Sequence, residues 1–123
     1  MRLPDFFDAA PRLTVRDPLA RLLGAAEDGM IDYTYADTVK LAGHSCPTVA
    51  AAYLMTRAAM RALYPDTVPE RGGIRVELRD DRLAGVTGVI ANVASFLTGA
   101  THDTGFKGIG GHFDRRNLLF FGV

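Results

Sequence analysis

The stretch "PTVAAAYLMTRAAMRALYP" (residues 47–65) decides the fold class, because it is the clearest helix in the sequence. Pro47 suits the first helical position, and Pro65 stands where the helix has ended. Its many alanines allow another element to pack closely against it. One face of the helix is formed at helical spacing by Val49, Tyr53, Thr56, Met60 and Leu63.

Three further segments around this helix also have helical features. The run "VTGVIANVASFLTG" (86–99) is apolar enough for a buried helix, with Gly99 as its C-cap. Asp17 and Pro18 are an N-cap and a first helical residue, and an amphipathic helix is expected to continue until Gly29. Its apolar face consists of Leu19, Leu22, Leu23 and Ala26. The segment 30–44 is ambiguous, with strand residues first and then a short helix that ends at Gly43.

Two segments are predicted to be strands. "GGIRVELRDD" (72–81) alternates apolar and charged residues, and "RRNLLFFGV" (115–123) has the features of an apolar terminal strand. Residues 1–16 contain Pro4 and Pro11 and are expected to form an arm on the surface or on a partner. The predicted architecture is therefore an α+β domain over residues 17–123, with a mixed or antiparallel sheet packed against two to four helices.

Composition excludes several classes of protein. A chain of 123 residues with 48% hydrophobic and 23% charged residues is expected to form one globular domain. Fourteen basic and fourteen acidic residues leave no net charge, and no basic stripe suggests nucleic acid. No apolar run reaches the roughly 20 residues of a membrane span, and the N-terminus lacks the apolar region of a signal peptide. A single cysteine fits a reducing cytoplasm.

The first candidate site is the turn before the long helix, where His44 and Cys46 stand two residues apart. If Pro47 begins the helix, Cys46 lies at its N-terminus, where free N–H groups and the macrodipole favour the thiolate. A thiolate and an imidazole together suit zinc and related ions. The alternative interpretation is a buried cysteine beside a capping histidine.

The second candidate site is the Gly-rich loop "GATHDTGFKGIGGHFDRRN" (99–117), which contains the other two histidines, His102 and His112. Loops of this length in compact domains are usually functional. The glycines match neither nucleotide-binding fingerprint, but backbone N–H groups with Lys107 could bind an anion. The simpler interpretation of each histidine is a solvated loop residue. We expect the three histidines and the cysteine to share one site.

The turn and several later segments resemble a known family. Gly43-His44-Ser45-Cys46-Pro47 ahead of an Ala-rich helix is similar to the Gly-His-x-Cys-Pro signature of the FmdE-like family, which takes its name from a component of formylmethanofuran dehydrogenase. Looser counterparts of later family segments are "GGIRVELRD", the helix up to "TGAT" (98–101), the loop around Lys107 and "RRNLLFF". The resemblance covers about residues 17 to 123.

This resemblance implies an α+β domain, commonly dimeric, with a transition-metal site formed by the signature His and Cys and a later Cys. His44 and Cys46 match the signature directly, but Ala100 stands where the family has the later Cys. We expect His102 to replace that ligand, with His112 as a fourth ligand or as a residue that orients one. The family name does not imply formyl-transfer activity for this chain.

The leading expectation is a small metal-binding protein with zinc as the default ion, acting as a homodimer, which either offers an open coordination position to a small ligand or hands the metal on. Tyr33, Asp103 and Lys107 are expected at the rim of that position. One alternative is an enzyme that uses Cys46 as a nucleophile, or a metal-activated water. Others are haem ligation through Cys46-Pro47 and a structural module pinned by a closed zinc site. The Ala-rich helix and the terminal strand are the expected dimer surfaces.

Overall fold

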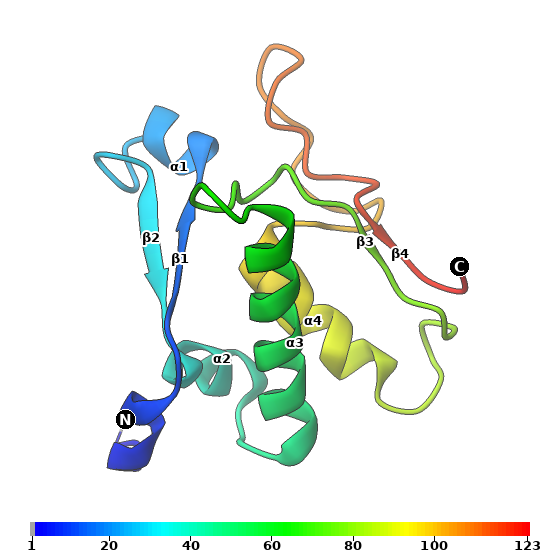
Figure 1. The fold of residues 1–123 in the computed structure, drawn as a ribbon. Helices are drawn as coiled ribbons and strands as arrows, with labels where there is room; N and C mark the ends of the chain where they lie inside the picture. Colours follow the sequence, from blue (N-terminus) through cyan, green and yellow to red (C-terminus); the bar gives the residue numbers. More distant parts are fainter. Residues whose placement is uncertain (1) are drawn as a thin grey trace.

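Helix α3 (Pro47–Leu63) lies at the centre of the computed structural model, which describes residues 2–123 (Figure 1). Its buried face consists of Val49, Ala52, Tyr53 and Met60, at the spacing of helical turns. The predicted long helix is therefore confirmed, from its first residue Pro47 to its end before Pro65.

Two further helices pack against α3 and against each other. The predicted buried helix is α4 (Thr87–Thr98), and it ends at Gly99 with a φ of 75°. Helix α2 (Tyr35–Ala42) begins with a capping box between Thr34 and Asp37 and ends at Gly43, as predicted. The three helices together enclose most of the hydrophobic core.

The N-terminal segment differs from the predicted arm. Strand β1 (Leu13–Arg16) pairs antiparallel with β2 (Met30–Tyr33), and Leu13 and Val15 are buried in the core. The 3-10 helix η1 (Asp5–Ala9) places the ring of Phe7 5.2 Å from that of Tyr35. Through Phe7, Leu13 and Val15 this segment packs into the core of the domain. Residue 1, also assigned to the arm, lies outside the described residues.

The predicted amphipathic helix after Asp17 is much shorter in the structure. Helix α1 covers only Pro18–Leu22, and the side chain of Asp17 caps it by accepting a 3.0 Å hydrogen bond from the N–H of Ala20. Leu22 and Leu23, predicted to face the core, are 58% and 61% exposed. The apolar spacing is present, but the turn lies outside the core and has no surface to pack against.

The strands β3 (Val76–Glu77) and β4 (Leu119–Phe120) form a short parallel pair on the other side of α3 and α4 from β1 and β2 (Figure 1). Both predicted strands are present but shorter than their apolar patterns, because regular ladder pairing is limited to Val76 with Leu119 and Glu77 with Phe120. Residues 2–123 therefore form an α+β domain of four α-helices and two small two-stranded sheets, which confirms the predicted fold class. None of the helices among these residues combines the length and the apolar character needed to cross a membrane.

A buried ion cluster joins the two sides of the domain. Arg115 donates to Asp17 at 2.7 Å, and Arg71 donates to the same carboxylate at 3.0 Å. Arg71 also donates two hydrogen bonds, of 3.0 and 2.8 Å, to the carbonyl oxygen of Phe96 at the end of α4. The cluster thereby fixes the start of α1, the end of α4 and the loop after α4.

Candidate functional site

The turn at residues 43–46 is held between two helices. Gly43 ends α2 with a φ of 81°, a left-handed conformation that glycine adopts at little cost. Cys46 is the N-cap of α3, and Pro47 is the first helical residue. The sequence-based expectation that Cys46 lies at a helix N-terminus is confirmed.

Cys46 is half-buried and packs partly against the core. The pKa of its thiol lies below the ordinary value, mainly because the backbone N–H of Val49 stabilises the thiolate. Partial burial acts in the opposite direction, while the His44 side chain and the N–H of Thr48 add to the lowering. A thiolate at this place can act as a metal ligand or as a nucleophile.

His44 is exposed next to Cys46, and its Nδ1 lies 3.2 Å from the carbonyl oxygen of Ala42. Because a carbonyl oxygen only accepts, Nδ1 donates in this contact, and Nε2 of the neutral ring keeps its lone pair. Metal-binding histidines are commonly oriented by such a bond from the other ring nitrogen. His44 and Cys46 are therefore two candidate ligands on one short turn.

Two residues that the sequence analysis did not single out support this turn. The hydroxyl groups of Tyr35 and Ser45 lie 2.7 Å apart in a hydrogen bond. The ring of Tyr35 is buried and lies 5.5 Å from that of Tyr53 on α3. The bond therefore ties the turn between His44 and Cys46 to the core. In the sequence, only a serine inside the turn and a tyrosine at the start of α2 could have indicated this hydrogen bond, and neither residue type at such a place is specific for it.

Asn92 is a further residue that the sequence analysis missed. It lines a cavity of about 120 Å³ together with His44 and Leu41. A second cavity of about 410 Å³ shares Leu41 and Asn92 and extends to Arg71 and Arg115. The two cavities therefore adjoin at Leu41 and Asn92. The sequence feature that could have indicated this residue is that Asn92 carries the single amide side chain of the largely apolar helix α4.

His102 and Asp103 lie on the exposed loop after α4. Nδ1 of His102 is 3.0 Å from Oδ1 of Asp103, and the two side chains are 51% and 69% exposed. The His102 ring lies 5.8 Å from that of Phe121. These contacts place His102 beside the terminal strand, with Asp103 as its partner.

His112 and Lys107 are also exposed on this loop. His112 forms an isolated backbone bridge with Ile109, and its ring lies 6.2 Å from that of Phe113. The loop is folded back on itself here, and Gly108 approaches the backbone of His112 so closely that a Cβ would lie 2.5 Å from its carbonyl oxygen. The glycine at this position is thus needed for the path of the loop.

Tyr33 lies in the hydrophobic core, where its ring is 4.9 Å from that of Phe96 and 6.0 Å from the guanidinium carbon of Arg71. Burial raises the pKa of its phenol above the ordinary value. This residue therefore stays protonated, packed beside the ion cluster.

The structure brings His44 and Cys46 together but does not bring the two loop histidines to them. Within residues 2–123, no three His, Cys, Asp or Glu side chains lie close enough to hold one metal ion. The predicted set of His44, Cys46, His102 and His112 therefore does not converge within one described chain. Spacing along the sequence indicated the first pair, but it did not fix where a long Gly-rich loop places its histidines relative to the turn.

Comparison of the chain with family models, with curated proteins and with solved structures found no match. The resemblance to the FmdE-like family therefore stays a prediction. The function proposed below is based on the geometry of the turn at residues 43–46.

Proposed function

We propose that this chain is a transition-metal-binding protein of the FmdE-like type, with zinc as the first candidate ion and His44 and Cys46 as its ligands. One observation supports the proposal above all: Cys46 occupies the N-cap position of α3, with His44 beside it on the same turn. The thiolate is the form that binds metal, and backbone N–H groups favour that form here.

The proposed centre is open. Structural zinc sites use four protein ligands and catalytic ones use three, whereas the turn supplies two. The remaining positions are thus available to a small ligand, for which the cavities beside Leu41 and Asn92 provide space. An anionic ligand would suit them, since Arg71 and Arg115 line the larger cavity against the single carboxylate of Asp17.

A second copy of the chain is the proposed source of further ligands. His102 and His112 lie apart from the turn within one chain, so they could join the ion only from a partner or after the loop moves. Exposed apolar side chains on α3, such as Leu54 and Met55, support the proposed homodimer. Sedimentation of the protein with and without zinc tests whether the ion and the dimer are linked.

The test of the ligand set is a Co²⁺ titration of the wild type and of four variants. Cobalt bound to a thiolate gives an intense charge-transfer absorption, which Cys46→Ala should abolish. His44→Ala should weaken cobalt binding at least about tenfold, because a ligand is lost. His102→Ala and His112→Ala test the loop histidines: weaker cobalt binding in either variant would make that residue a ligand supplied by a partner or by a moved loop, and unchanged binding would exclude it. Unchanged cobalt binding in Cys46→Ala would rule out the proposed centre.

A second candidate function is catalysis with Cys46 as the nucleophile, which the lowered thiol pKa favours. The structure provides His44 as a nearby base, but Nδ1 of His44 contacts the carbonyl of Ala42 instead of an orienting carboxylate. A strong Soret band in the purified protein would instead support haem ligation by Cys46.

Alkylation of Cys46 by iodoacetamide separates the candidates. The thiol should react faster below pH 8 than a free cysteine does, because its pKa is lowered. If the residue is a metal ligand, added zinc should slow the reaction strongly, whereas a free nucleophile should react at the same rate. A profile like that of free cysteine would contradict the lowered pKa.

A further inference from the structure

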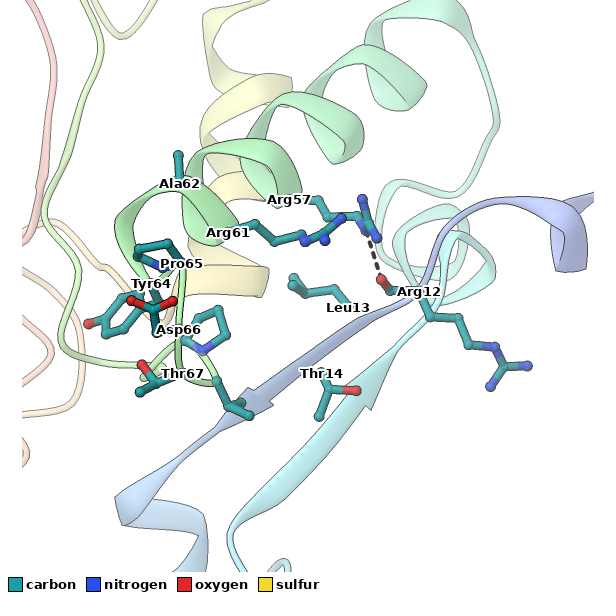
Figure 2. A pocket seen from close by; sticks show the side chains of 12 residues that line it. Arg12, Leu13, Thr14, Arg57, Arg61, Ala62, Tyr64, Pro65, Asp66 and Thr67 are labelled. Atoms are coloured by element: carbon teal, nitrogen blue, oxygen red, sulfur yellow. Dashed lines mark hydrogen bonds between the residues drawn. The ribbon is translucent and has the colours of Figure 1, made fainter.

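A cavity of about 700 Å³ lies between the C-terminal half of α3 and strand β1, at the opposite end of α3 from Cys46 (Figure 2). Its volume lies within the range of about 300–1,000 Å³ that small-molecule sites occupy. None of the residues assigned to the metal centre lines it. Any function of this cavity is therefore separate from the proposed function.

Three arginines line this cavity, and two of them, Arg57 and Arg61, belong to α3; the side chain of the third, Arg12, extends away from these two (Figure 2). Arg57 and Arg61 stand one helical turn apart, and both side chains extend from α3 toward β1 (Figure 2). Nε of Arg57 donates a 2.7 Å hydrogen bond to the carbonyl oxygen of Arg12, which orients its guanidinium group. Among residues 2–123, no carboxylate forms an ion pair with either arginine.

This arrangement is unfavourable for the protein alone. Like charges four residues apart on one helix face repel each other and destabilise the helix. The negative end of the helix dipole favours a basic residue in the last turn, which accounts for Arg61. It does not account for a second guanidinium group on the same face and over the same cavity. An anion between the two arginines would offset their repulsion.

The rest of the lining indicates what else the ligand contains. The hydroxyl group of Thr67 provides a neutral hydrogen-bonding partner, and Pro65 and Val68 provide exposed apolar surface. Asp66 is the one carboxylate among the lining residues. The cavity thus combines a cationic part with an apolar and hydroxyl-bearing part, as sites for phosphorylated small molecules do.

We infer that this cavity binds a small phosphate monoester, with the phosphate group between Arg57 and Arg61 and the organic part against Pro65 and Val68. A phosphate monoester carries nearly two negative charges at pH 7, which matches two guanidinium groups, whereas a monocarboxylate carries one. The planar guanidinium fork also fits phosphate oxygens in a bidentate manner.

The test is isothermal titration of the full chain with AMP, inorganic phosphate and adenosine at low ionic strength. AMP should bind saturably, phosphate should compete with it, and adenosine should not bind measurably. Arg57→Gln and Arg61→Gln should each weaken AMP binding about tenfold or more, because each removes a charge-assisted contact. Arg79→Gln, which removes an exposed arginine outside the cavity, should leave the affinity unchanged. Asp66→Asn should tighten binding.

Arg61→Gln keeps the proposal falsifiable if Arg57→Gln fails to fold, because Arg61 is exposed on the last turn of α3. Absence of saturable AMP binding, or equal binding by wild type and Arg61→Gln, would overturn the inference. Equal affinity for succinate and phosphate would overturn the phosphate assignment. Tighter binding of a single-stranded oligonucleotide than of AMP, with a steep salt dependence, would assign the arginines to nucleic acid instead.

Discussion

Among single residues, two ionisable side chains stand out. Cys46 and Asp17 each occupy a helix N-cap position, and the pKa of each side chain is lowered there. Cys46 owes its lowered pKa mainly to backbone N–H groups that only a helix start provides. Asp17 is nearly fully buried. Its negative charge is stable there because Arg71 and Arg115 donate hydrogen bonds to the carboxylate. Both residues show how a helix N-terminus stabilises an anion.

Asp17→Asn should lower the free energy of unfolding at pH 7 by about 3–5 kcal/mol, because it leaves the buried Arg115 without its counter-charge. Burial raises the pKa of Asp17, but hydrogen bonds from Arg115, the N–H of Ala20 and Arg71 outweigh it and lower the pKa. The carboxylate therefore stabilises the fold above the ordinary Asp pKa of about 3.9, and this is lost as the pH falls through the lower folded value.

Urea unfolding of the wild type and Asp17→Asn at several pH values between neutral and about 3 measures this dependence. The stability difference between them should shrink at the acid end. Glu27→Gln is the matched control, since Glu27 is exposed and should change stability by less than about 0.5 kcal/mol. Equal stability of Asp17→Asn and wild type at pH 7 would show that the ion cluster does not hold the domain.

At the scale of elements, the end of α4 is fixed by a close contact that the sequence pattern only partly reveals. Gly99 has a φ of 75°, and a Cβ there would lie 2.5 Å from Nη1 of Arg115. Gly99→Ala should therefore cost the strain of a left-handed alanine, about 1–2 kcal/mol, and in addition displace Arg115 from Asp17. We expect a total loss of about 3 kcal/mol in thermal or urea unfolding.

Gly24→Ala is the control for this prediction. Gly24 has the same φ of 75°, but a Cβ there would meet nothing within 4 Å. The variant should lose only the conformational part, about 1–2 kcal/mol. If Gly99→Ala and Gly24→Ala were equally destabilised, the packing of Arg115 against Gly99 would have no energetic role.

The helices could be predicted from the sequence where the apolar spacing was long and both ends had caps. Pro47 and Pro65 fixed α3, and Gly99 fixed the end of α4. The apolar residues after Asp17 have the same spacing over fewer turns, and there the pattern overstates the helix, because no core surface lies opposite Leu22 and Leu23. Whether a short amphipathic segment is helical depends on tertiary packing, which the local pattern does not contain.

The strands are harder to predict for a related reason. Pro4 and Pro11 precede "LTVR" and are typical of a surface arm, so the sequence predicts an arm where β1 lies, although apolar residues alternate in β1. The two later strands lie where the alternating segment 72–81 and the apolar segment 115–123 predict them, but they pair over only two residues each. Strand length depends on a partner that is distant in the sequence, so alternation alone does not determine it.

At the scale of the whole molecule, the chain has two separate features on opposite ends of α3. The turn with His44 and Cys46 lies at its N-terminus, and the cavity with Arg57 and Arg61 lies toward its C-terminus. The sequence located the turn because its chemistry is local. It did not locate the cavity, because Leu13 and Arg61 meet there only after β1 has folded against α3.

The positions of the loop histidines, His102 and His112, also depend on the fold of the whole chain. A loop can place its side chains on several neighbouring elements, and here it places His102 beside Phe121 of the terminal segment. Within residues 2–123 neither loop histidine lies with His44 and Cys46, so a contribution of His102 or His112 needs a second chain or a moved loop, which cobalt binding by His102→Ala and His112→Ala tests.

Metal binding at the turn is tested first by elemental analysis of the purified wild-type protein, beside its visible absorption spectrum and before any chelator is added. If His44 and Cys46 bind a metal ion, we expect about one zinc or other transition-metal ion per chain in the wild type and none in Cys46→Ala. A metal-free and colourless wild-type protein that also fails to take up added zinc would contradict metal binding at the turn, and Cys46 would then be only a thiol at the start of a helix.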